Sequence, residues 1–247
     1  MLVILPAMVL LGILAGFIAN YLSDVLPRTR SLSKPVCHQC NQALGIAQYI
    51  FLRPCHHCGA NRSTRSWIVQ IIYPFAFVYL TFFSSSRLGM WIGAGLLLYF
   101  GLVVIMDMEH RLILSQISLA GAIIGVSAGL YLHGWKITLI GAVAGFGIMW
   151  ILFFMGEIYL RILSKQRGEV IDEVALGFGD VNLGGVLGLI LGWPGITAGL
   201  LFAILLGGLF SGGYLIYTMV NKRYHPNTAM PYAPFLILGA MLLLYRP

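Results

Sequence analysis

Two aspartates, Asp107 and Asp180, stand where apolar runs meet polar segments, and they are the residues best placed to do chemistry. Asp180 ends the tetrad Gly177-Phe178-Gly179-Asp180 and opens an apolar run. An ionisable residue at membrane level is costly and by default marks a functional site. The glycines remove side chains beside Phe178, so another backbone can approach closely, and we predict Gly177 and Gly179 as substrate-binding residues. A second interpretation stays open, in which Asp180 caps the following helix by accepting its free N–H groups.

The chemistry that such a pair of carboxylates supports is hydrolysis with one shared proton. Asp107 closes the apolar run 88–106, and two further runs return the chain to the same side before Asp180. Two close carboxylates cannot both ionise cheaply, so they share a proton. One then accepts a proton from water while the other donates to a carbonyl oxygen, as in aspartic proteases. We therefore predict Asp107 and Asp180 as a catalytic pair. Glu157 is a weaker candidate, because Arg161 one helical turn later is expected to pair with it.

All the cysteines of the chain form two Cys-x-x-Cys pairs in one short polar segment: Cys37 and Cys40, then Cys55 and Cys58. Two such pairs present four thiolates in a tetrahedron, which is the geometry of structural zinc. The alternatives are two disulfides or thiols of no consequence, and a reducing cytosolic face disfavours the disulfides. The histidines of the segment are expected to be solvated, because four cysteines complete the shell. The segment is too short to bury much core, so metal would supply its folding energy.

Composition places these residues in a membrane protein. Of 247 residues, 59% are hydrophobic and only 9% are charged, whereas soluble domains carry about 25% charged residues. We predict an all-α, polytopic bundle of about eight transmembrane helices with a small cytoplasmic zinc-binding lobe. The first helix is expected at 1–22, the zinc lobe at 23–66 and a membrane core of about seven helices at 67–247. The core helices are expected near 67–84, 88–106, 115–132, 136–160, 181–193, 196–219 and 231–246.

Basic residues and glycines refine this arrangement. With residue 1 outside, the inner loops hold twelve of the 15 Lys and Arg residues and the outer side three. This positive-inside bias predicts that the cysteine lobe and both aspartates face the cytoplasm. The net charge of +7 then reflects the basic residues that set the orientation in the membrane. We therefore expect the lipid bilayer as a partner and no nucleic acid. Glycines at four-residue spacing predict closely packed helix faces, at 121, 125 and 129 and again at 141 and 145.

In the order of its motifs the chain resembles the type IV prepilin peptidases, membrane aspartic peptidases of the Gly-x-Gly-Asp type. The resemblance covers nearly the whole length. It is carried by Gly16-Phe-Ile-Ala-Asn20 before Leu26-Pro27, the two Cys-x-x-Cys pairs, Asp107-Met-Glu-His-Arg-Leu-Ile-Leu114, Gly177-Phe-Gly-Asp180-Val-Asn-Leu183 and Pro231-Tyr-Ala-Pro234-Phe-Leu236.

The resemblance implies a function. Members of this inner-membrane family cut the leader from prepilins or pseudopilins on the cytoplasmic side, and many methylate the new N-terminus with S-adenosylmethionine. The family's catalytic pair corresponds to Asp107 and Asp180. Four departures bear on methylation and substrate preference more than on proteolysis: Val25 for arginine, Gln70 for glutamate, Leu114-Ser115 for Pro-Asp and Asn182 for lysine. The alternatives are a peptidase without methyltransferase activity, a presenilin-type peptidase, and a non-catalytic membrane transporter or assembly scaffold.

Overall fold

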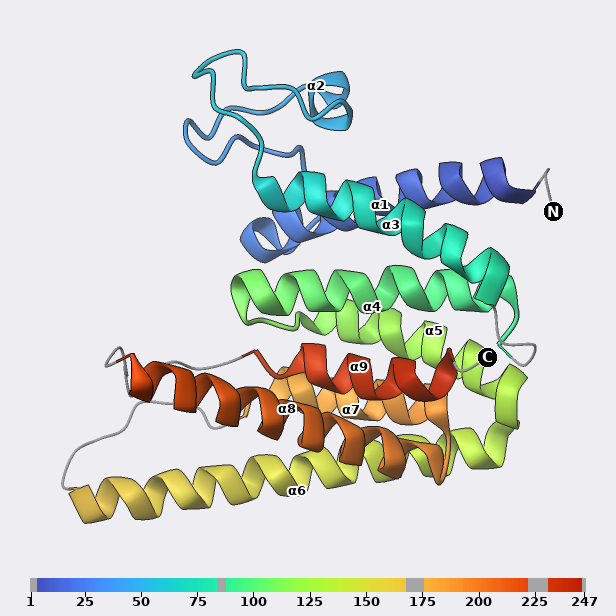
Figure 1. Cartoon of the computed structure of the whole chain (residues 1–247), viewed down its shortest axis with the longest axis vertical. Coiled ribbons are helices and arrows are strands. Elements are labelled where there is room, and N and C mark those ends of the chain that lie inside the picture. The colour runs from blue at the N-terminus through green and yellow to red at the C-terminus, as the bar shows by residue number, and fades with distance from the viewer. Residues whose placement is uncertain (1–3, 84–87, 168–175, 222–230, 246–247) are drawn as a thin grey trace. The chain divides into compact units, whose positions relative to one another are not determined.

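The computed structural model of the chain describes residues 4–83, 88–167, 176–221 and 231–245. These residues form helices and connections, and the described part contains no strand beyond an isolated bridge between Val36 and Ala43 (Figure 1). The chain divides into two compact units, one up to Met106 and the other from Asp107 to Arg246. The predicted all-α fold is confirmed.

Five of the described helices are long and apolar enough to cross a membrane. They are α1 (Ile4–Thr29), α4 (Met90–His110), α5 (Ser115–His133), α6 (Trp135–Arg167) and α8 (Gly195–Val220). The other expected spans also contain helices, which are α3 (Thr64–Phe83), α7 (Phe178–Leu191) and α9 (Ala233–Leu244). At 1.5 Å per residue, the 14 residues of α7 and 12 of α9 reach only about 18–21 Å, against ~30 Å of hydrocarbon. Eight full spans are therefore more than the structure shows.

The first unit is organised by the pairing of α1 with α3. A Cβ on Gly12 would lie 2.5 Å from the Cα of Pro74, so only glycine permits this approach of α1 to α3. One turn along, the Gln70 side-chain amide donates to the Ile13 carbonyl at 3.0 Å. The cysteine segment joins the two helices and contains α2 (Ile46–Ile50). The lobe is thus held at both ends by one packed helix pair.

The second unit is built around α7, which packs against α5 and α6 and also contacts α8 and α9. The predicted glycine faces are confirmed at these contacts. A Cβ on Gly141 would lie 2.3 Å from the Gly188 carbonyl oxygen, and one on Gly145 would lie 2.3 Å from that of Gly184. On the α5 side, a Cβ on Gly129 would lie 2.1 Å from the Leu189 oxygen. Because the backbones touch, α7 is buried on most sides although it is short.

Candidate active site and metal centre

Asp107 lies in the last turn of α4, because that helix continues to His110 rather than ending at residue 106. The side chain is only 6% exposed. Its Oδ2 accepts a hydrogen bond of 3.1 Å from the backbone N–H of Ala233, the first residue of α9. Arg111 follows α4 with a positive φ of 50° and adds a cation within electrostatic range of the carboxylate. Asp107 is therefore a buried carboxylate with a fixed donor.

Asp180 lies in the first turn of α7, and its surroundings differ from those of Asp107. The N-cap position belongs to Gly177, which has extended backbone, so the interpretation of Asp180 as the cap is wrong. The Asp180 N–H donates to the Gly177 carbonyl at 3.0 Å. The side chain is 9% exposed, and its Oδ1 is buried without a hydrogen-bond partner among the described residues. Such an orphaned buried oxygen is costly unless a ligand or water satisfies it.

The fold brings the two aspartates together from α4 and α7. Their carboxylates lie within electrostatic range of each other, and Tyr232, the N-cap residue of α9, lies within range of Asp180. Sequence reasoning found both acids but not the Ala233 N–H. The signal that points to it is Pro234 in the first turn of α9, because prolines mark helix starts, whose free N–H groups need acceptors. Three helix ends thus converge on one pair of carboxylates.

The two predicted substrate-binding glycines have different surroundings. A Cβ on Gly177 would lie 3.3 Å from Asp180 Oδ2, so the missing side chain leaves room beside the carboxylate. A Cβ on Gly179 would lie 2.8 Å from the Ile113 Cβ, so Gly179 also permits α7 to pack on the connection between α4 and α5. Elsewhere in this unit, Glu157 pairs with Arg161 at 3.6 Å, as expected.

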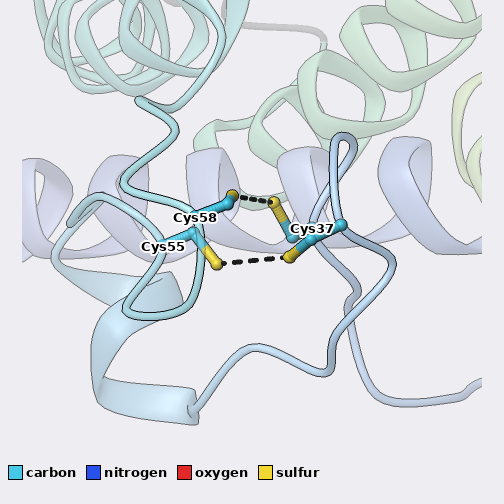
Figure 2. A group of neighbouring side chains, drawn as sticks. Cys37, Cys55 and Cys58 are labelled. Atoms are coloured by element: carbon cyan, nitrogen blue, oxygen red, sulfur yellow. Dashed lines mark hydrogen bonds between the residues drawn. The ribbon is translucent and has the colours of Figure 1, made fainter.

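The four cysteines form a second site, in the first unit. The sulfur atoms of Cys37 and Cys58 lie 3.6 Å apart, those of Cys40 and Cys55 lie 3.7 Å apart, and all four lie within 4.8 Å of one another (Figure 2). A disulfide would require about 2.05 Å, and the four cysteines are free. A tetrahedral zinc with bonds of about 2.3 Å separates its sulfurs by about 3.8 Å. The cluster therefore fits a metal such as zinc.

The two cysteine pairs have matching backbone turns. The Cys37 N–H donates to the Gln42 carbonyl at 2.8 Å, and the Cys55 N–H donates to the Ala60 carbonyl at 2.9 Å. The residue after the second cysteine of each pair is left-handed: Asn41 with φ 56° and Gly59 with φ 69°. Such turns aim backbone N–H groups at the first sulfur of each pair.

These backbone donors favour the thiolate. The N–H groups of Cys40 and Gln39 lower the pKa of the Cys37 thiol to about 6. The corresponding N–H groups of Cys58 and His57 lower the pKa of Cys55. The first cysteine of each pair is thus disposed toward the deprotonated form, which is the form that binds metal.

Asp24 on α1 fastens the cysteine lobe, a role that sequence reasoning missed. Its carboxylate accepts hydrogen bonds from the Tyr49 hydroxyl at 2.6 Å and from Arg62 at 2.9 Å, and it also pairs with Arg65. The Arg62 guanidinium lies over the Tyr49 ring at 4.4 Å. His38 lies 3.8 Å from the same carboxylate, so this histidine faces the ion pairs and not the sulfur cluster. Asp24 therefore joins α1, α2 and the start of α3.

A cavity of about 480 Å³ lies between α5, α6 and α7. Asn182 and Gly185 line it from α7, and Ser118 lines it from α5. Asn182 follows Asp180 by two residues, which places it about 200° further around the helix. The cavity therefore opens on the opposite side of α7 from the aspartate pair.

Comparison with known proteins identifies the relatives of this chain. Residues 91–212 match the type IV leader peptidase family. A curated relative from Aeromonas salmonicida, named prepilin leader peptidase/N-methyltransferase, is 24% identical in an alignment of length 221 that covers 84% of this chain and 69% of the relative. The chain is similar to the type IV leader peptidases. A relative of the same name from Bacillus subtilis is 24% identical, and the alignment covers 90% of this chain and 83% of the relative. Another from Pectobacterium carotovorum is 28% identical, and the alignment covers 83% of this chain and 71% of the relative. No solved structure matches.

Three of the residues that depart from the pattern of the type IV leader peptidases have defined positions in the structure. Gln70 bonds to α1 through its amide nitrogen, while its buried Oε1 has no partner among the described residues. Leu114 is the extended N-cap residue of α5, and its carbonyl accepts the N–H groups of Ile117 and Ser118. Asn182 lines the cavity behind Asp180. None of these three residues replaces either carboxylate.

Proposed function

We propose that this protein is a membrane aspartic endopeptidase that cleaves the leader from type IV prepilins or pseudopilins at the cytoplasmic membrane interface. The observation that carries the proposal is the pair Asp107 and Asp180, which two helices hold buried and within electrostatic range. The family match spans both residues, and the relatives are named prepilin leader peptidases. A transporter or scaffold is less well supported, because nothing in that class accounts for the ordered motifs.

The unequal surroundings of the two carboxylates support a division of roles between them. Asp107 receives the Ala233 N–H and faces the cation Arg111, and both stabilise a negative charge. Asp180 has an unpartnered oxygen and holds the shared proton. Asp107 then accepts a proton from the attacking water while Asp180 donates its proton to the scissile carbonyl oxygen. Collapse of the tetrahedral intermediate then breaks the C–N bond. The leaving amine takes the proton from Asp107, and a hydroxyl of the intermediate returns a proton to Asp180, which leaves a carboxylic acid and restores the shared proton.

The position of the pair supports a particular kind of substrate. Asp107 is in the last turn of α4 and Asp180 is in the first turn of α7, so the scissile bond is expected at the membrane interface. A fitting substrate has a polar leader in water and an apolar helix in the bilayer. The space left by Gly177 beside the Asp180 carboxylate suits an extended substrate strand. The excess of basic residues on one side supports a cytoplasmic location for this site and the cysteine lobe.

The remaining parts of the proposal concern cofactors. The four cysteines are proposed to bind one structural zinc that holds the lobe folded and takes no part in hydrolysis. N-methylation of the new N-terminus is proposed from the names of the relatives. S-adenosylmethionine would supply the methyl group, and we assign no residue of this chain to it.

The decisive experiment replaces each aspartate alone and both together. Asp107→Asn and Asp180→Asn should each reduce cleavage of a purified prepilin by at least about 10³-fold, and the double variant should be no worse, because the two residues act as a unit. Glu157→Gln is the matched control, since it removes an acid from the same unit without touching the pair. Cleavage by either single variant at a tenth of the wild-type rate would refute the dyad. Product mass with and without S-adenosylmethionine tests methylation separately.

A further inference from the structure

The cysteine lobe exposes an apolar face on α2. Ile46 is 78% exposed and Phe51, directly after α2, is 66% exposed, while Ile50 one turn after Ile46 is 39% exposed. The same stretch buries Tyr49 and Leu52 against the lobe. The lobe therefore has enough buried apolar side chains for its own core, and the three exposed ones lie on its outer surface.

This face lies beside α1 and not beyond its end. The Tyr49 ring packs edge-to-face on Tyr21 with centroids 6.4 Å apart, and the Tyr49 hydroxyl donates to Asp24. Tyr21 and Asp24 belong to α1, which runs on to Thr29, so α2 is level with the last turns of a candidate membrane span. Figure 1 shows the lobe turning back alongside α1 and α3. Tyrosines concentrate at the headgroup level of membranes, which is the depth that this arrangement gives to α2.

The charges around the face are basic. The chain has no Asp or Glu between Asp24 and Asp107, and Asp24 is already paired with Arg62 and Arg65. The segment stays net positive even when a zinc tetrathiolate is counted. Arg53 is exposed, and its guanidinium lies over the Phe51 ring at 5.6 Å, so a cation borders the apolar face. Apolar side chains edged by basic ones match an anionic lipid surface. A basic substrate leader would instead be repelled.

We propose that Ile46, Ile50 and Phe51 insert at the headgroup level of an anionic bilayer, with Arg53 on the lipid phosphates. The lobe then lies flat on the membrane next to α1. Long cationic side chains keep their charge at such an interface while their stems stay in apolar surroundings. This inference does not depend on the proposed peptidase activity.

The test uses the full-length protein in bilayers with a fluorescent amino acid at position 46, introduced by stop-codon suppression. Lipids carrying a nitroxide near the headgroup should quench this probe by at least about half in phosphatidylcholine mixed with phosphatidylglycerol. Arg53→Gln should reduce the quenching in the anionic bilayers and leave it unchanged in phosphatidylcholine alone. Bound metal measured on each variant shows that the lobe is intact.

Quenching of the probe at position 46 by less than about half in the anionic bilayers overturns the proposal. Quenching that does not respond to Arg53→Gln overturns the role of the basic rim. A probe that is shielded only when a prepilin is added would assign the face to a protein partner instead of lipid. Because no step requires cleavage, failure of this proposal is distinguishable from failure of the proposed peptidase function.

Discussion

The contact between Gly188 on α7 and Gly141 on α6 makes Gly188→Ala an informative change. An added Cβ would lie 2.1 Å from the Gly141 carbonyl oxygen and 3.0 Å from the Cα of Ala142. Both neighbours are backbone atoms, so no side-chain rotation relieves the clash. Ordinary contact between a carbon and another heavy atom needs roughly 3.5 Å, so α7 must move away from α6 by about 1 Å.

The expected change in the free energy of unfolding follows from two opposing contributions. Overpacking costs typically about 1–3 kcal/mol, while alanine has a helix propensity about 1 kcal/mol better than glycine, so the net destabilisation is about 0–2 kcal/mol. The effect on cleavage should be larger. Asp180 lies on the same helix as Gly188, and a shift of about 1 Å at a catalytic group can reduce the rate by about 10²-fold. A variant that stays folded but loses most activity is therefore expected.

Gly208→Ala on α8 is the matched control, because a Cβ there meets nothing within 4 Å. It should be neutral or slightly stabilising. Unfolding in detergent, followed by far-ultraviolet circular dichroism, measures stability, and the mass of a cleaved prepilin measures activity. If Gly188→Ala matches Gly208→Ala in both assays, the helix contact does not position Asp180 and the reasoning fails.

Three further predictions concern the lobe and the substrate. Cys37→Ser combined with Cys55→Ser should abolish the single equivalent of zinc expected in the wild type, and full metal occupancy in that variant would contradict the four-cysteine site. Asp24→Ala removes the carboxylate that pairs with Arg62 and Arg65, so it should destabilise the lobe by about 3–5 kcal/mol and speed zinc release to a chelator. Unchanged release would show that the network is dispensable. Moving the prepilin cut site one helical turn, about 5.4 Å, into its apolar run should stop cleavage, whereas lengthening its polar leader should not. Equal cleavage of the shifted and native substrates would favour a site deeper in the membrane.

Hydropathy located the helices well but overestimated how many are long enough to cross a membrane. Every expected apolar range contains a helix, because 59% hydrophobic composition forces the backbone to satisfy its own polar groups. The same signal does not distinguish a helix in lipid from one surrounded by protein. Residues such as Leu183 and Ile190 of α7 are fully buried by the neighbouring helices, so α7 needs no full membrane length. The expected range 181–193 was already this short, so what hydropathy does not measure is the packing that buries the helix.

The candidate site was predictable where side chains carry the signal. Asp107 and Asp180 are rare acids at the ends of apolar runs, and the cysteine spacing alone indicates a metal-binding cluster. The Ala233 N–H was not predictable, because a backbone donor has no residue type to recognise and lies 126 positions from its acceptor. The role of Asp24 depends on the folded lobe, which brings Tyr49 and Arg62 to it.

The hydrogen bond from Ala233 to Asp107 has a consequence for the order in which the protein is made. The carboxylates are both present once synthesis has passed Asp180, yet the donor belongs to α9, the last helix described. A nascent chain that ends at residue 212, the limit of the family match, has the acids but lacks this group. If that bond sets the charge on Asp107, the protein gains its hydrolytic competence only when α9 has entered the membrane, so chains whose synthesis has not reached α9 are inert toward other membrane proteins.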